Sequence, residues 1–391
     1  MQSWRFLLLY ALAVAGGAAA YVPFLTILLP LKVTGMAGDD GVRLLAYVAF
    51  AGAIFASGSN VLFGWLSDIT KNRRGWILAG LASSSGLLIL SGEARDTTTL
   101  IALICAWQIG LNMMLAPLAA WAGDCVPDGQ KGLLGGLLSF SPAAGAMAGA
   151  LVTIPGLAGP DARLELVALI VACLVLPVVV FGNARPMPHL VRPASPVPDQ
   201  DTPYLQNRSA TVRMWMARLL VQIAEAALFA YLLFWFRSID GDFRDNDTAI
   251  LFGAVLLAGV PLALWLGRWS DRHERPILPL TLGAAGIACG LLIMAAAPDL
   301  GMAVAGYVVF GLASSVFLAL HSSQTLRVLP KPQNRGRDLG LFNLTNTTPS
   351  LVMPWLALAL VPVFGFGALF VCLAVLSAVA ALILMTLVPR K

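Results

Sequence analysis

The sequence predicts an all-α membrane protein with twelve transmembrane helices in two pseudo-symmetric six-helix bundles. Three observations predict this fold class: the composition, the regular recurrence of apolar runs, and an internal repeat. The chain has 391 residues, of which 59% are hydrophobic and 12% are charged, whereas soluble domains carry about 25% charged residues. Because this depletion of charge extends over the whole length, lipid is the expected solvent, and no room remains for a separate soluble domain.

Each apolar run is long enough for a bilayer core, which takes roughly 20 residues of helix. The runs cover residues 6–31, 43–66, 76–92, 98–121, 133–154 and 164–182, and then 213–237, 248–267, 277–297, 301–326, 338–362 and 365–388. The first run begins like a secretory signal peptide, but its apolar character continues to about Leu31, which is too long for such a segment. We therefore expect it to be retained as helix 1.

The segment between the two halves, residues 183–212, holds six prolines and shows no apolar periodicity. Such a composition predicts an extended linker. The expected domains are therefore an N-terminal bundle at 1–182, a cytoplasmic linker at 183–212 and a C-terminal bundle at 213–391.

A short polar and basic break, GWLSDITKNRRGW at residues 64–76, separates the second run from the third. A second copy, GRWSDRHERP, occupies residues 267–276. By subtraction, Gly64 and Gly267 lie 203 positions apart. The same offset relates Asp68 to Asp271, Gly80 to Gly283, Pro127 to Pro330 and Gln130 to Gln333. Agreement at several separate places indicates a duplicated unit in register.

The distribution of lysine and arginine predicts the orientation. If the N-terminal side is called inside, 18 of the 25 basic residues fall inside and 6 outside, and Arg218 lies within a span. The positive-inside bias then places both termini and the linker in the cytoplasm. We expect a bacterial inner membrane. The five cysteines lie in or beside apolar runs without a close pair, so we interpret them as small buried hydrophobes and expect no metal site.

Six spans, a basic cytoplasmic linker, six further spans and a Gly-x-x-x-Asp loop after helices 2 and 8 resemble the major facilitator superfamily. The residues that match the family's loop motif are Gly64, Ser67, Asp68, Arg73 and Arg74, with Gly267, Asp271 and Arg275 in its weaker second copy. Residues 67–75 and 335–343 also resemble loops of the glycoside–cation symporter and sucrose-transporter branch. This finer resemblance implies a sugar or glycoside substrate. Since residues 48–66 contain no carboxylate, a sodium site is not expected on helix 2.

The loop motif predicts a cytoplasmic latch. Gly64 has no side chain, so a neighbouring helix can pack closely against it. Asp68 ends helix 2 and can pair with Arg73 or Arg74, and Asp124 at the inner end of helix 4 offers a second carboxylate. Such a cluster, with Gly267, Asp271 and Arg275 as its second copy, would hold the inner face closed until the protein opens inward. The alternative is a plain positive-inside loop.

Charged residues at mid-membrane depth are costly, so each one calls for an explanation. Glu225 lies about twelve residues into helix 7, and Arg218, Gln222 and Glu225 are four and three apart, which places them on one side of the helix. We expect Glu225 to carry a coupled proton or to contact substrate, with a structural pair to Arg218 as the alternative. His321 is the second proton candidate, because histidine titrates near neutral pH. Arg218 is either part of this coupling group or a side chain that reaches the cytoplasmic interface.

Neutral polar residues complete the candidate substrate site. They are Tyr21 on helix 1, Asn60 on helix 2, Gln108 and Asn112 on helix 4, Gln222 and Tyr231 on helix 7, His321 and Gln324 on helix 10, and Asn343 and Asn346 on helix 11. Amides and hydroxyls suit a polyhydroxyl or amphiphilic ligand. The alternative for each amide is a helix–helix hydrogen bond, which contributes about 0.6 kcal/mol on average.

No nucleotide-binding loop, catalytic triad or metal-ligand spacing occurs in the sequence, so we expect neither an enzyme nor a cofactor. The hypothesis is a secondary active transporter that works by alternating access and is coupled to protons. Its expected partners are a small-molecule substrate, the proton and the lipid bilayer, without nucleic acid, and the expected state is a monomer. Efflux of drugs, lysolipids or other amphiphiles is one alternative, and a non-transporting assembly or sensor protein is another.

Overall fold

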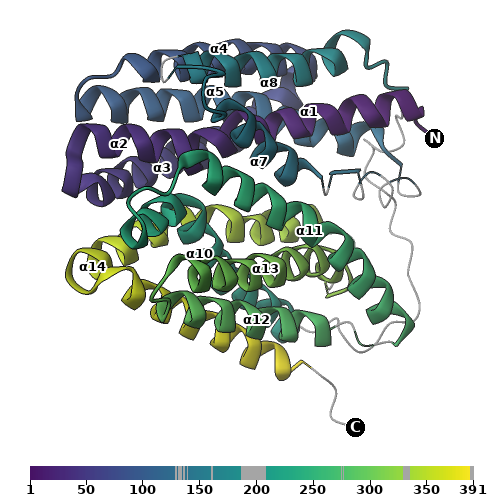
Figure 1. The fold of residues 1–391 in the computed structure, drawn as a ribbon. Coiled ribbons are helices and arrows are strands. Elements are labelled where there is room, and N and C mark those ends of the chain that lie inside the picture. Colours follow the sequence, from purple (N-terminus) through teal and green to yellow (C-terminus); the bar gives the residue numbers. More distant parts are fainter. Residues whose placement is uncertain are drawn as a thin grey trace. The chain divides into compact units, whose positions relative to one another are not determined.

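The computed structural model describes residues 1–127, 130, 134, 137–138, 140–159, 162–185, 208–273, 275, 277–328 and 335–387, with the side chains of Asp39, Gly123, Arg208, Asp271, 322–344 and Thr347 outside the description. The regular structure in these ranges is helical (Figure 1), as predicted. Contacts divide the chain into two compact units. Unit 1 comprises Met1–Pro193 with Arg244–Gly253, and unit 2 comprises Ala194–Phe243 with Ala254–Lys391. The start of the helix after Phe243 thus groups with the first half of the chain.

Unit 1 contains α1 (Trp4–Pro23), the π-helical turn η1 (Phe24–Leu28), α2 (Leu29–Ala37), the 3₁₀ turn η2 (Gly38–Asp40), α3 (Gly41–Thr70), α4 (Arg73–Glu93), α5 (Thr97–Cys125), α7 (Ser141–Val152) and α8 (Ala162–Phe181). The segment Trp4–Ala37 is one continuous span of 34 residues. It passes through the π turn directly after Pro23, where proline lacks the N–H that an α-helix needs. The span therefore extends six residues beyond the predicted end at 31.

Unit 2 contains α10 (Arg208–Ile239), the part of α11 (Asp245–Arg272) that follows Gly253, α12 (Leu278–Ala295), α13 (Leu300–Val328) and α14 (Arg335–Met385). The last of these joins two predicted spans across a kink. At the kink Gly365 has φ 75° and ψ 179°, a conformation that glycine adopts readily and other residues avoid. The break lies where the sequence predicted it, between residues 362 and 365.

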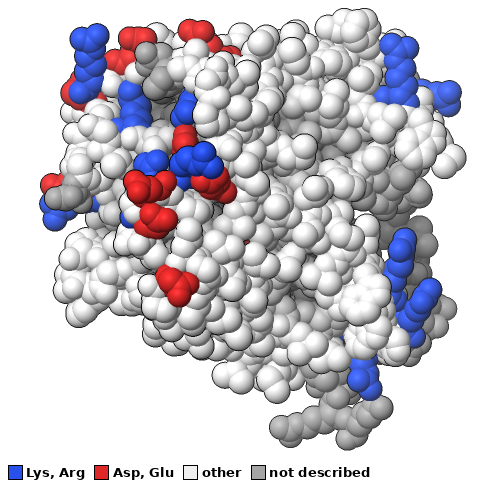
Figure 2. Space-filling view, viewed as in Figure 1, with Lys and Arg blue, Asp and Glu red and all other residues white. Residues whose placement is uncertain are grey.

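In the described ranges, ten helices are long and apolar enough to cross a membrane. The predicted number of twelve is reached when α14 is divided at Gly365 and α7 is included, although α7 is described for only 12 residues. Large apolar side chains are exposed along these helices, including Val61 at 74% and Leu382 at 62%. Such a surface suits lipid. In Figure 2 the visible face of each unit is uncharged over most of its area, with the Lys, Arg, Asp and Glu side chains gathered toward the ends of the helices.

Small residues allow close helix packing in both units. A Cβ at Gly80 of α4 would lie 2.3 Å from the Met114 backbone nitrogen of α5, and one at Gly290 of α12 would lie 2.5 Å from that of Phe310 of α13. Only glycine permits backbones to approach this closely. Close packing at a glycine therefore brings α4 against α5 and α12 against α13 in the same way.

The repeat is also present in the structure. Asp96 accepts a hydrogen bond from the Thr99 backbone at the start of α5, and Asp299, 203 positions later, accepts one from the Met302 backbone at the start of α13, each at 2.9 Å. These are equivalent helix N-caps. The duplicated unit thus preserves local structure as well as sequence.

Candidate functional site

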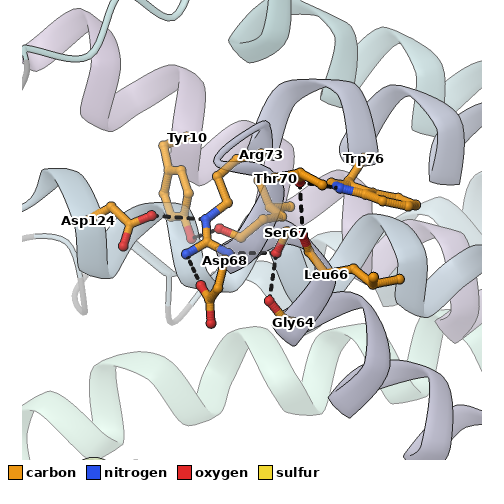
Figure 3. Close-up of polar contacts among 10 residues, drawn as sticks. Tyr10, Gly64, Leu66, Ser67, Asp68, Thr70, Arg73, Trp76 and Asp124 are labelled. Atoms are coloured by element: carbon orange, nitrogen blue, oxygen red, sulfur yellow. Dashed lines mark hydrogen bonds and ion pairs between the residues drawn. The ribbon is translucent and has the colours of Figure 1, made fainter. Parts of the chain in front are cut away.

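The loop between α3 and α4 places Arg73 at the centre of a polar cluster (Figure 3). Lys71 adopts a left-handed conformation with φ 51°, and Asn72 caps α4 by accepting from the Gly75 N–H. Arg73 then begins α4. Its Nε lies 2.9 Å from Asp124 Oδ2 of α5, and another of its nitrogens is bonded to Asp68 of α3. Its Nη1 also donates to Ser67 Oγ at 2.5 Å.

This arrangement makes Arg73 the centre of a clamp joining α3, α4 and α5. We call Ser67, Asp68, Arg73 and Asp124 the Arg73 cluster. The Arg73 side chain is only 13% exposed, compared with 64% for Asp68 and 37% for Asp124. All of these residues belong to unit 1. The contacts with both predicted carboxylates are thus present, and the role of a latch that opens remains a proposal.

Arg74 has different partners from Arg73. It donates to the Gly182 carbonyl after the end of α8, and its guanidinium lies 5.3 Å from the centre of the Trp121 ring. Within unit 1 no helix packs closely on Gly64, because nothing lies within 4 Å of a Cβ built there. Near Gly64, the residues that α3 buries are Phe63 and Ser67. Gly64 itself lies beside this buried face of the helix.

The second copy of the loop differs from the first. Gly267 does pack closely, since a Cβ there would lie 3.1 Å from Leu320 of α13. Ser270 Oγ donates to the Arg275 carbonyl and the Arg275 N–H donates to the Ser270 carbonyl, each at 3.1 Å. The Arg275 side chain is exposed, and within the described part of the loop no ion pair forms with it. Asp271's side chain lies outside the described residues.

Unit 2 brings four of the predicted site residues together from three helices. Arg218 and Gln222 of α10 both donate to Asn346 Oδ1 of α14, at 3.2 and 2.8 Å. Arg218 Nη1 also lies 3.5 Å from Nδ1 of His321 on α13. We call Arg218, Gln222, His321 and Asn346 the Arg218 cluster. Arg218 and Gln222 were predicted to share one side of their helix, and the packing of α10 against α13 and α14 adds His321 and Asn346.

The described contacts of His321 favour one tautomer. The side chain is fully buried, and its Nε2 lies 3.0 Å from the Met214 carbonyl oxygen. A carbonyl oxygen only accepts, so Nε2 carries a proton, whereas Arg218 only donates, so Nδ1 carries none. A second proton on Nδ1 would place two cations against each other. This geometry disfavours the predicted role of His321 as a proton carrier and assigns it the positioning of Arg218.

Glu225 lies one turn beyond Gln222 on α10 and is half-buried. The predicted structural pair with Arg218 does not form: among the described residues, Glu225 makes no hydrogen bond or ion pair, although Tyr307 of α13 is close enough to be influenced by its charge. Tyr231, further along α10, is almost fully buried, and its hydroxyl has no hydrogen-bond partner in the described part of the chain. Protonation of Glu225 would therefore break no described contact.

The polar residues predicted in unit 1 form a smaller, neutral group. Asn60 of α3 donates to Asn112 Oδ1 of α5 at 3.0 Å, and Asn112 donates to the Gln108 carbonyl one turn earlier at 2.9 Å. We call Asn60, Gln108 and Asn112 the Asn112 group. The Asn60–Asn112 bond is the helix–helix contact that was the alternative to substrate binding. Tyr21 is half-buried on α1, and the side chains of Gln324 and Asn343 lie outside the described residues.

An ion pair that the sequence analysis missed joins α8 to the start of α11. Arg163 Nη1 lies 2.6 Å from Asp245 Oδ2, with each side chain 18% exposed. Beside it, Asn246 donates to the Ala150 carbonyl and to Thr153 Oγ, at 2.8 and 3.0 Å. All five residues belong to unit 1. The only sequence signal was the presence of a basic residue and an acidic loop on the same predicted outer side.

In the described ranges, no group of three His, Cys, Asp or Glu could hold a metal ion.

The comparisons with known proteins agree with this architecture. A family model, Major Facilitator Superfamily, matches residues 239–391. The crystal structure of the human organic anion transporter MFSD10 (TETRAN) is similar with a TM-score of 0.68 and 16% sequence identity, covering 97% of this chain and 99% of that one. The chain has the major facilitator fold. At this identity the likeness to TETRAN concerns the fold alone, and neither comparison points to the sucrose or glycoside–cation branch. A search of curated protein sequences found no match.

Proposed function

We propose that the protein is a secondary active transporter that moves a small organic solute across a membrane by alternating access. The observation that carries this proposal is the Arg218 cluster, in which a cation, a histidine and two amides from three apolar helices gather within unit 2. Charged groups inside membrane helices are costly and are usually retained for function. The fold and the name of TETRAN, an organic anion transporter, support the same class of activity.

The energy source that we propose is a proton gradient acting through Glu225. This carboxylate follows Gln222 by one turn, about 4.5 Å along the helix axis at 1.5 Å per residue. It has no described hydrogen bond or ion pair that protonation would break, and it is close to the residues proposed to bind the solute. Sugars and glycosides remain the first solute class to test, with amphiphilic drugs and lysolipids second.

Proteoliposomes containing the full-length protein provide the test. Uptake of labelled sugars and amphiphiles is measured with and without a pH gradient, and with a protonophore that removes the gradient. We expect at least one solute to accumulate above its external concentration only when the gradient is present. Fluxes equal to those of empty liposomes for every solute, in both directions, would favour the non-transporting assembly or sensor protein instead.

A further inference from the structure

We infer that the solute is an organic anion whose carboxylate is bound by Arg218, Gln222 and Asn346. This inference rests on the proposed transport function and adds the chemical class of the solute. It selects acidic sugars and other organic carboxylates over neutral glycosides.

The orientation of the Asn346 amide is the first step. Arg218 is a donor only, so the atom of Asn346 that faces it must be the oxygen. Gln222 donates to the same oxygen, and these two bonds occupy its lone pairs. The Asn346 NH₂ group therefore keeps two hydrogens for another acceptor. The cluster presents donors, and a ligand that fits it must supply acceptor oxygens.

The fixed charge is the second step. Arginine stays protonated in proteins, and its planar fork matches a carboxylate with two parallel hydrogen bonds. His321 fixes this fork from behind, because its Nδ1 accepts from Arg218 while its Nε2 is bonded to the Met214 carbonyl. Among its described contacts, Arg218 lies against a neutral ring and an amide oxygen, which restrict its orientation, and a preorganised donor loses less entropy on binding.

The third step is access. His321 is fully buried, Arg218 and Gln222 are half-buried, and Asn346 is exposed. The cluster is therefore buried on the side of His321 and accessible on the side of Asn346. A carboxylate can approach from the Asn346 side, while a larger remainder of the solute stays outside the cluster.

The experiment uses two matched pairs of probes that differ in charge and little in shape. They are phenyl β-glucuronide with phenyl β-glucoside, and benzoate with benzamide. Binding to the purified full-length protein in detergent is followed by the shift of its thermal transition. We expect the anion of at least one pair to raise the transition temperature and its neutral partner to leave it unchanged. Equal shifts for both members, or no shift from any of the four, would overturn the inference.

Variants of Arg218 test whether anion binding depends on the Arg218 cluster. Arg218→Gln is expected to weaken anion binding by about 10- to 100-fold, the loss expected for hydrogen bonds to a charged group. Arg218→Lys keeps the charge and loses the planar guanidinium, so its affinity for the anion should lie between those of Arg218→Gln and the wild type. It also provides a test if Arg218→Gln does not fold. Arg213→Gln is the matched control, since Arg213 lies on the same helix and bonds Ser209 and Thr386 instead. Anion binding that survives Arg218→Gln unchanged would also reject the assignment.

Counterflow of the same probes in proteoliposomes separates this inference from the transport proposal. If the glucoside is transported and the glucuronide is not, transport stands and the anion site fails. If the anion binds through Arg218 without any flux, the site stands and transport fails.

Discussion

The two halves of the duplicated chain differ most where α10 meets its neighbours. The offset of 203 positions aligns Arg218, Gln222, His321 and Asn346 with Ala15, Ala19, Leu118 and Ala143. The helices that carry them pack in the same combinations, α10 with α13 and α14 in unit 2 and α1 with α5 and α7 in unit 1. One scaffold thus carries a charged cluster in unit 2 and an apolar contact in unit 1.

The amide contacts of unit 1 lie between other helices and carry no charge. Its amides lie between α3 and α5, and at the crossing equivalent to that of His321 the Tyr10 hydroxyl donates to the Leu118 carbonyl at 2.8 Å. Glu225 likewise corresponds to Val22. The comparison indicates that the duplicated halves share their helix packing, whereas the residues that we propose for anion binding and proton coupling have apolar counterparts in unit 1.

Replacing Glu225 by glutamine should have the largest effect on this difference. The amide cannot take up or release a proton, so we expect accumulation driven by a pH gradient to be lost, while exchange of solute down its own gradient persists. Uptake and counterflow in proteoliposomes measure the two activities. Glu165→Gln, which changes an exposed acid of unit 1 in the same way, is the control. Uphill transport that is unchanged in Glu225→Gln would assign coupling to another group.

The Arg73 cluster offers the next largest effect. Arg73→Gln removes bonds to two carboxylates, and because both carboxylates are partly exposed we expect a loss of only about 1–2 kcal/mol of stability. Asp124→Asn should cost more than Asp68→Asn, since Asp124 is the less exposed partner. Thermal unfolding in detergent measures the order.

Arg275→Gln is the comparison variant from the second loop. This exposed arginine should change stability by no more than about 0.5 kcal/mol. Equal losses for Arg73→Gln and Arg275→Gln would mean that the two loops do not differ as the contacts indicate. If the Arg73 cluster is also a latch, Arg73→Gln will increase labelling of cysteines placed on the cytoplasmic side.

The Asn112 group should respond weakly. A helix–helix hydrogen bond in a membrane protein contributes about 0.6 kcal/mol, so Asn60→Leu and Asn112→Leu should each change transport by about threefold or less. Because the two residues share one bond, the double variant should be no worse than the more damaging single one. A loss of transport comparable to that of Arg218→Gln would place the solute against unit 1 as well.

The smallest effect concerns the paired caps at Asp96 and Asp299. The hydrogen bond from the Thr99 hydroxyl, with that from the Thr99 N–H, holds the pKa of Asp96 below its ordinary value of 3.8. A lowered folded pKa means that this stabilisation is present above pH 3.8 and is lost as the pH falls through the folded value. Protection of the amides at the start of α5 from hydrogen exchange, relative to the unfolded chain at the same pH, should therefore fall at low pH in the wild type. Asp96→Asn should remove this acid dependence and leave the start of α13 unaltered. Identical acid profiles for wild type and variant would contradict it.

The membrane class, the places of the spans, the duplication and the polar positions on single helices were all within reach of the sequence. Apolar runs and three- and four-residue spacings are local properties, so the alignment of Arg218, Gln222 and Glu225 followed from helix geometry alone. The break at Gly365 also followed from the local sequence, because one predicted apolar run ends at residue 362 and the next begins at residue 365. The finer resemblance to sugar carriers rested on short loops, and the comparisons gave it no support.

Tertiary structure alone decided which polar groups meet. Asn346 lies 128 positions from Arg218, and Asp124 lies 51 from Arg73, so each contact depends on how separate helices pack. The same packing placed His321 between Met214 and Arg218, left Glu225 without the predicted pair to Arg218, and left Gly64 without a close neighbour within unit 1. Backbone geometry sets the spacing of side chains within a helix, whereas the partner of a side chain on another helix is set by the fit of whole surfaces.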